Sequence, residues 1–344
     1  MKYGWQIKEI EDKLSKLPDK ELSTHYENVS RLVYEEMLSD YSGKIGVMHS
    51  DNAKTDFIKA VQEFDFNDIN SNHLNVAIYL GEIFKELEFE MPSIQLPNYG
   101  LEEIVDISKV YMRRKESGNN YLFKKIISNP KRLHIKFNQS IYNFLGKSYI
   151  LSDSEFYVLI NGINGVQDTV SFLHESGHIE DFFRKKESLP LRYLELASLT
   201  REHYAFDFMR GIENEEDVEK ARKVSLYHYL ARIIRLYNTI MLVMTLNSDQ
   251  EYFASVLDEH EKKKLNINMT GITGILQSNF EEELMYITSF IASLDIYLNC
   301  LQEEAPMFVS MYQMGKRDVT VKVIDRIIPY LCDVFSYKPN VKSI

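Results

Sequence analysis

The chain has 344 residues, of which 44% are apolar and 26% charged, an ordinary balance for a folded protein with a substantial buried core. Its 40 Lys and Arg side chains are outnumbered by 51 Asp and Glu, giving a formal net charge of −11. Because an acidic surface repels phosphate backbones, we expect no nucleic-acid partner. The two cysteines, Cys300 and Cys332, lack the spacing of a metal site and favour a reducing compartment.

No segment is predicted to enter a membrane. The first residues of the chain turn acidic before any apolar stretch forms, so no signal peptide is expected. No uncharged apolar run approaches the roughly 18 residues that are needed to span a bilayer. We therefore expect a cytoplasmic protein without a membrane partner.

Residues 1–128 are predicted to form a helical region. Apolar residues recur there at three- and four-residue intervals among charged ones. The stretches with this pattern are residues 22–38, 55–64, 75–90 and 101–114. Two prolines and a glycine, Pro92, Pro97 and Gly100, mark a loop between the last two stretches.

The pattern changes from helix to strand between about residues 130 and 163. Residues 132–137 alternate polar and apolar side chains, as a half-buried strand would. Residues 148–151 and 155–160 are short, rich in aromatic or β-branched residues and bounded by Asn, Gly, Ser and Asp. These segments predict a small antiparallel sheet.

From residue 166 onward the helical pattern returns. The expected helices are residues 166–185, 191–209, 216–246, 249–262, 280–301 and 319–334. Together the elements predict a mainly α protein, with a small antiparallel sheet directly before the helix of residues 166–185 and a helical bundle around both. We expect residues 129–344 to form the functional region, closely packed with the helical region 1–128.

Residues 174–178 read His-Glu-Ser-Gly-His. On a helix, His174 and His178 lie about one turn apart on one face, so both imidazoles can reach a single ion, for which Zn²⁺ is expected. Glu175 is rotated by about 100° and can face a water molecule at the metal without binding the metal itself. Such a match arises by chance in roughly one chain in several hundred to a thousand, but the apolar side of this helix and the Gly-containing turn before it favour a metal site.

A catalytic zinc site needs a third protein ligand and an open position. No further histidine follows at a short spacing, and Glu195 and Glu202, which would share a helix face, are the candidates. Glu195 has apolar neighbours, so either a metal or a buried salt bridge must offset the cost of its charge. Glu202 is interpreted as orienting a ligand histidine or as structural. We interpret His134, His203 and His228 as packing or surface residues.

These motifs resemble the thimet oligopeptidase and oligoendopeptidase F family of zinc metallopeptidases. Its members carry His-Glu-x-Gly-His followed by Glu-x-x-Ser-x-x-x-Glu, matched here by His174 to His178, Glu195 to Ser198 and Glu202. The resemblance implies a zincin-like catalytic domain with zinc on His174, His178 and Glu195. It also implies that residues 157–162 belong to an edge strand that pairs with the substrate backbone.

The resemblance is specific over roughly residues 155–205, and the chain departs from the family in three ways. The chain is little more than half the usual family length. The gap between His178 and Glu195 is shorter than in the family. The family also has a histidine and several tyrosines near the C-terminal end that stabilise the oxyanion, whereas here no histidine follows His260, and Tyr286 is the best match for a tyrosine.

The motif and the resemblance together predict a zinc-dependent metalloendopeptidase that hydrolyses short or unstructured peptides. Glu175 is the expected general base, and Tyr286 is expected to donate a hydrogen bond to the oxyanion. The other interpretation of Tyr286 is a core aromatic residue. Two alternative functions remain open, namely a peptidase-like protein that binds peptides without cleaving them and a zinc hydrolase of a non-peptide amide.

Overall fold

The computed structural model describes residues 4–19, 53–67, 69–85, 98–115, 120–128, 133–136, 146–152, 155–160, 165–184, 195–248, 269–276 and 280–335, and the single residues 27, 31, 34, 35, 38, 162 and 193. The chain divides into two compact units. The first consists of Met1–Asp68 and Asn238–Phe280, and the second of Ile69–Tyr237 and Glu281–Ile344. Every residue of the expected metal site lies in the second unit.

The first unit contains α1 (Gly4–Ser15), α3 (Ala53–Glu63), α11 (Met269–Gly274) and the end of α9 (Glu215–Ser248). Helix α3 packs against α11. Its buried residues Phe57, Ala60 and Val61 follow the three- and four-residue spacing seen in the sequence. Three aromatic rings, Phe64, Phe66 and Phe280, form a cluster beside them with centroids 4.7, 5.1 and 6.1 Å apart.

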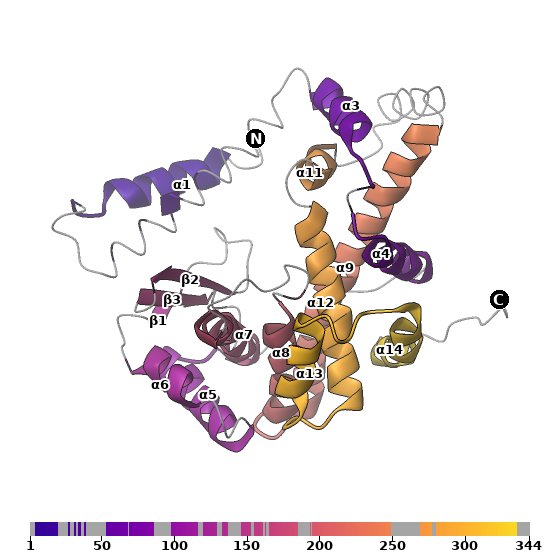
Figure 1. Cartoon of the computed structure of the whole chain (residues 1–344). Coiled ribbons are helices and arrows are strands. Elements are labelled where there is room, and N and C mark those ends of the chain that lie inside the picture. The colour runs from indigo at the N-terminus through magenta and orange to yellow at the C-terminus, as the bar shows by residue number, and fades with distance from the viewer. Residues whose placement is uncertain are drawn as a thin grey trace. The chain divides into compact units, whose positions relative to one another are not determined.

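The second unit contains a small sheet and most of the helices, so the expectation of a mainly α protein is confirmed (Figure 1). Its helices are α4 (Ser71–Phe84), α5 (Leu101–Lys115), α6 (Asn120–Ile127), α7 (Gly165–Arg184), α8 (Leu196–Met209), the first part of α9, α12 (Phe280–Asn299), α13 (Ala305–Gln313) and α14 (Val321–Val334). The expected helix 249–262 and most of the expected helix 22–38 lie outside the described residues. Helices α5 and α6, which precede residue 129, belong to this unit and pack against α7.

The sheet has three strands in the order β1-β3-β2 and precedes α7, as expected. Strands β2 (Gly146–Ser152) and β3 (Glu155–Ile160) pair antiparallel, with Ser148 opposite Val158. Strand β1 (Leu133–Lys136), however, pairs parallel with β3. The sheet is therefore mixed, and the expectation of an antiparallel sheet holds for β2 and β3 only.

The central position of β3 corrects a second expectation. Because β3 is paired on both sides, its residues 157–160 are not part of an edge strand that could accept a substrate backbone. The physical reason lies in its sequence: all five residues from Phe156 to Ile160 are buried, with exposures of 0–5%. Such a continuous apolar run fits a strand that is covered on both faces. Among the described strands, β1 and β2 form the edges.

Helix α7 lies at the centre of the second unit. It contacts the sheet through β2 and β3, and it also contacts α5, α6 and α8 (Figure 1). Every residue from Gly165 to Leu173 is buried, which is typical of a helix that is surrounded by other elements. Two of its hydroxyl groups are satisfied within the helix: Thr169 Oγ1 donates to the carbonyl of Gly165, and Ser176 Oγ donates to the carbonyl of Phe172. A helix held on so many sides is a rigid platform for the side chains that it carries.

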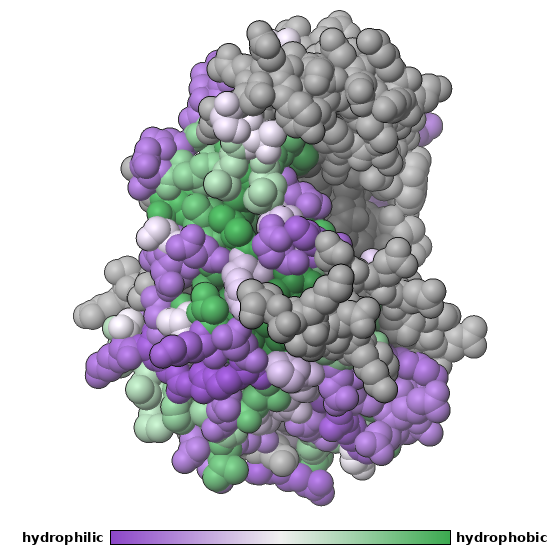
Figure 2. Space-filling view, turned by 90° about the vertical axis from the view of Figure 1, so that its right-hand side faces the viewer, coloured by the Kyte–Doolittle hydropathy of each residue, from purple (hydrophilic) through white to green (hydrophobic). Residues whose placement is uncertain are grey.

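The described surface is mixed in character. On the face shown in Figure 2, hydrophilic residues cover much of the described area, and hydrophobic residues gather between them. The large apolar side chains that remain exposed are Val110, Phe182, Ile212, Met244, Leu298, Leu301, Met307, Met314 and Val321. Within the described ranges, none of the helices combines the length and the apolar character that crossing a membrane requires.

Candidate metal centre

The close approach of α7 and α8 depends on a glycine. A Cβ atom added to Gly177 of α7 would lie 2.7 Å from Oγ and 3.1 Å from Cα of Ser198 on α8. Real side chains do not tolerate such distances, so only glycine lets the first turn of α8 lie directly on α7. This contact brings two glutamates close to the two histidines of α7. Glu195 immediately precedes α8, and Glu202 lies two turns further on.

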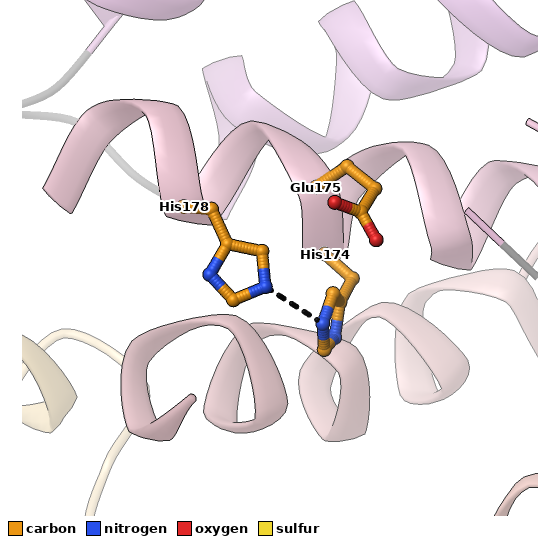
Figure 3. A group of neighbouring side chains, drawn as sticks. All are labelled: His174, Glu175 and His178. Atoms are coloured by element: carbon orange, nitrogen blue, oxygen red, sulfur yellow. Dashed lines mark hydrogen bonds between the residues drawn. The ribbon is translucent and has the colours of Figure 1, made fainter. Parts of the chain in front are cut away.

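Three donor atoms converge between these helices. The Nε2 atoms of His174 and His178 are 3.2 Å apart, with the two imidazoles next to each other on α7 (Figure 3). Oε2 of Glu195 lies 3.4 Å from Nε2 of His174 and 3.1 Å from Nε2 of His178. Ligands that surround Zn²⁺ tetrahedrally at 2.0–2.1 Å are separated from one another by about 3.3 Å. The three atoms therefore already have the mutual spacing of three corners of a zinc tetrahedron.

The hydrogen bond on the far side of His174 sets the direction of its lone pair. Nδ1 of His174 lies 3.1 Å from Oε2 of Glu202. Since an ionised carboxylate can only accept, Nδ1 donates, and in the neutral ring Nε2 then carries the lone pair. That lone pair points toward His178 and Glu195. A carboxylate behind a histidine is the usual partner of a metal-binding imidazole.

Glu202 is itself held by two side chains of α9. Ser225 Oγ donates to Oε1 of Glu202, and the Tyr229 hydroxyl donates to Oε2 over 3.3 Å. Ser225 and Tyr229 are four residues apart and so lie on the same face of α9. The Tyr229 ring is stacked on Phe290 of α12, with centroids 4.7 Å apart. A chain of buried contacts thus runs from α12 through α9 and Glu202 to His174.

Glu195 lies at the N-terminus of α8 rather than within the helix that was expected over residues 191–209. Its backbone is already helical, with φ −84° and ψ −8°, and its carbonyl accepts the N–H of Leu199 over 2.9 Å. Two residues earlier, the fully buried Tyr193 donates a hydrogen bond to Asp318 over 2.5 Å. The segment before α8 is therefore anchored to the chain ahead of α14, and Glu195 is held at a fixed point.

The electrostatics of this cluster favour a cation. Oε2 of Glu195 is buried and, among the described residues, accepts no well-directed hydrogen bond, although it faces both imidazoles. Burial lowers the pKa of His174, but its ion pairs with Glu195 and Glu202 outweigh burial and hold that pKa well above its ordinary value. The pKa of His178 is also raised, because Glu195 outweighs burial.

The same ion pairs lower the pKa values of the two carboxylates. Burial raises the pKa of Glu195, but the two imidazoles outweigh it and hold the pKa below its ordinary value. The pKa of Glu202 is lowered against burial by His174. A metal ion that binds here must displace protons from the two imidazoles, so its affinity is expected to fall as the pH is lowered.

Glu175 lies beside the metal-binding face. Its side chain is buried at 7% exposure, and its ligand atoms are within 4.8 Å of those of His174 and His178. Strand β2 begins directly against it: a Cβ atom on Gly146 would lie 2.9 Å from Cγ and 3.2 Å from Oε1 of Glu175. A glycine at the start of β2 therefore leaves room for the Glu175 carboxylate between the sheet and the cluster.

Tyr286 also reaches this region, from α12. Burial raises the pKa of its hydroxyl, and the negative charge of the Glu195 carboxylate raises it further. The phenol is therefore protonated at neutral pH and can donate a hydrogen bond. The guanidinium of Arg232 lies over its ring, 3.7 Å from the centroid. The structure thus places His174, Glu175, His178 and Glu195 close together, and Tyr286 is near enough for its pKa to respond to the Glu195 carboxylate.

The other histidines of interest lie away from this cluster where the structure describes them. His203 is buried on α8, with Nε2 3.0 Å from Oγ of Ser293, and burial lowers its pKa to about 3, so it is neutral. This confirms the interpretation of His203 as a packing residue. His228 lies exposed on α9, and the side chain of His134 lies outside the described residues.

Sequence reasoning missed Gly146, Ser225, Tyr229 and Arg232. Each reaches the cluster only through tertiary packing, and each belongs to a residue type that is common on helices or at strand ends. The one available signal was the spacing of Ser225, Tyr229 and Arg232, which places three polar side chains on one face of α9.

Comparisons with known proteins give structural likenesses only. No model of a protein family matches the sequence, and none of the curated proteins matches it. The structure is similar to that of a protein described as an oligoendopeptidase F from Bacillus anthracis, with 13% identity, a TM-score of 0.44 and 91% of this chain covered. It is also similar to a protein described as a peptidase from Chlamydophila abortus, with 14% identity, a TM-score of 0.44 and 96% coverage.

A third similar structure is PZ peptidase A with an inhibitor, at 13% identity, a TM-score of 0.44 and 96% coverage of this chain. The chain spans less than two thirds of the length of all three proteins, with 62%, 62% and 63% of them covered.

The contact between Gly177 and Ser198 yields the first prediction. Gly177→Ala forces α8 away from α7, so we expect a loss of about 1–3 kcal/mol in the free energy of unfolding together with weaker zinc binding. Urea denaturation of the metal-free protein and titration calorimetry with Zn²⁺ measure the two effects. The control is Gly274→Ala in α11, where an added Cβ meets nothing within 4 Å. Wild-type stability and zinc affinity in Gly177→Ala would contradict this account of the contact.

The bond between Glu202 and His174 yields the second prediction. Glu202→Gln leaves the shape of the site intact but weakens the acceptor for Nδ1, so the dissociation constant for Zn²⁺ should rise roughly 10- to 100-fold. Tyr229→Phe should also raise the dissociation constant for Zn²⁺, but by a smaller factor. Tyr227→Phe, two residues away on another face of α9, is the matched control and should bind zinc normally. Unchanged zinc affinity in Glu202→Gln would show that this bond does not orient the imidazole.

Proposed function

We propose that this chain is a zinc-dependent metallopeptidase that hydrolyses peptide bonds in short or unstructured peptides. The observation that carries the proposal is the convergence of Nε2 of His174, Nε2 of His178 and Oε2 of Glu195 at mutual distances of 3.1–3.4 Å. Two imidazoles and one carboxylate form a donor set that suits zinc and leaves a fourth position open. Structural zinc sites, by contrast, are closed by four protein ligands.

A zinc ion held by these three residues would lower the pKa of a water molecule and polarise the carbonyl of the scissile bond. Glu175 follows His174 directly on the same helix and lies beside the donor atoms. Its carboxylate takes one proton from the attacking water and then delivers it to the leaving nitrogen. The water oxygen forms a bond to the carbonyl carbon, the C–N bond breaks, and a carboxylic acid and an amine result.

Tyr286 supplies the hydrogen bond that the developing oxyanion requires. Its phenol is protonated, since burial and the nearby Glu195 both raise its pKa. It approaches from α12, whereas Glu175 is on α7, so the acceptor and the donor come from different elements of the second unit. A donor of this kind stabilises the transition state more than the ground state.

The burial of the site favours an extended substrate. The side chains of His174, His178 and Glu195 are exposed by 14%, 21% and 9%. The rigid surface of a folded protein would not reach donor atoms that are covered to this extent, whereas an extended peptide would. This favours short or unstructured peptides as substrates.

The test is Glu175→Gln, which keeps the size of the side chain and removes its basicity. We expect the variant to retain one zinc per chain, by elemental analysis, while kcat on a mixed peptide library falls roughly 10²- to 10⁴-fold. The control is Glu281→Gln, at an exposed position on α12, which should cleave as the wild type does.

Two results would contradict the proposal. Zinc without cleavage of any peptide by the wild type would leave a peptide-binding protein or a hydrolase of a non-peptide amide. A wild-type protein that binds no zinc would remove the metal site altogether.

A further inference from the structure

One guanidinium is held between two side chains of α12. Glu283 and Tyr286 are three residues apart and therefore lie on the same face of that helix. Arg232 of α9 donates from Nε to Oε2 of Glu283 over 2.7 Å and from a terminal nitrogen to Oε1 over 3.3 Å. The same guanidinium lies 3.7 Å from the centroid of the Tyr286 ring. Arg232 thus bonds to one side chain and covers the ring of the next.

The hydrogen bonds to Glu283 restrict where the guanidinium can lie. Glu283 is buried at 6% exposure, and Arg235 also donates to it over 2.8 Å. A buried carboxylate loses much free energy if its partners leave, so this pair of arginines is held in place. The fork of Arg232 is planar and rigid, which fixes the position of its flat face once two nitrogens are bonded.

The ring that Arg232 covers is the one that reaches the metal cluster. The carboxylates of Glu195 and Glu175 raise the pKa of the Tyr286 hydroxyl, which places the ring near both of them, and Tyr286 is only partly buried. A partly exposed phenol can turn about its side-chain bonds unless something holds its face. A cation over an aromatic ring is attracted to the negative face of the ring and resists that rotation.

Arg232 is one of three side chains on one face of α9 that contact Glu202 or Tyr286. Ser225, Tyr229 and Arg232 are spaced four and three residues apart and share one face of α9. The first two hold Glu202, which in turn holds His174. The third contacts Tyr286. One face of α9 thus supports a metal ligand at one end and the oxyanion donor at the other.

We propose that Arg232 is a positioning residue that sets the orientation of the Tyr286 phenol at the metal cluster by lying over its ring. This inference rests on the proposed function for its effect on catalysis, but the positioning itself does not require catalysis. Arg232 bonds to Glu283 and covers the ring of Tyr286, and it is not one of the residues proposed to hold the metal. Its whole effect on turnover passes through Tyr286.

The kinetic test compares Arg232→Met, Tyr286→Phe and the double variant in the zinc-loaded protein. Arg232→Met should lower kcat about tenfold, because the donor is misplaced rather than removed, and should leave KM nearly unchanged. Tyr286→Phe should lower kcat about 100-fold. The double variant should be no slower than Tyr286→Phe alone, since the phenol through which Arg232 acts is gone.

Two further variants serve as controls. Arg232→Lys keeps the charge but not the planar fork, so its kcat should lie between those of wild type and Arg232→Met. If Arg232→Met does not fold, Arg232→Lys takes its place in the comparison. Arg210→Met removes another arginine that bonds through two nitrogens to a glutamate, Glu219, away from the cluster, and should keep wild-type kcat. A change in KM alone, or losses that multiply in the double variant, would overturn the proposal.

A second measurement is independent of peptide cleavage. With 3-fluorotyrosine placed at position 286, the fluorine resonance reports the surroundings and orientation of that ring. We expect a single resonance in the otherwise wild-type protein and a shifted or split one in Arg232→Met, with no change in Arg210→Met. If the wild type cleaves no peptide, the proposed function fails, while this spectrum still decides whether Arg232 positions the ring. An unchanged resonance in Arg232→Met would refute the inference.

Discussion

Burial of charge between α7 and α8 is the constraint on which the rest of the second unit depends. His178, Glu195 and Glu202 each lie within hydrogen-bonding distance of His174, and the two carboxylates are buried. Isolated charges at such depth would cost several kcal/mol each. The imidazoles and the carboxylates offset one another, and a divalent cation would bind the three lone pairs that meet at the centre. The missing side chain at Gly177 is what allows these groups to come so close.

The elements around this cluster hold it from several sides. The sheet and α5 and α6 pack on α7, which keeps the two histidines and Glu175 in place. Helix α9 supports Glu202 through Ser225 and Tyr229, and it contacts Tyr286 of α12 through Arg232. Tyr193, two residues before Glu195, is held by its hydrogen bond to Asp318. A site that must hold atoms to within a fraction of an ångström needs such support, because donors on loose elements would not keep their spacing.

The sequence predicts the parts of the site that are local and misses those that are not. The spacing of His174 and His178 is a property of one helix. Glu195 and Glu202 were candidates because they follow in the next helical segment, and the family resemblance singled out Glu195. The strands were found, but the parallel pairing of β1 and the central place of β3 depend on which edges meet in space. Glu195 proved to precede its helix, yet its helical backbone keeps it on the expected side. No local pattern ties Ser225 to Glu202, which precedes it, or Arg232 to Tyr286, which follows it.

The most direct test of the central claim is X-ray absorption at the zinc edge, on protein that has been loaded with one zinc per chain. The account predicts a first shell of nitrogen and oxygen only, at about 2.0–2.1 Å, with the outer-shell scattering of two imidazoles. In His178→Ala the contribution of one imidazole should disappear. A sulfur scatterer at about 2.3 Å, a shell without imidazole, or a spectrum that does not change in His178→Ala would contradict it.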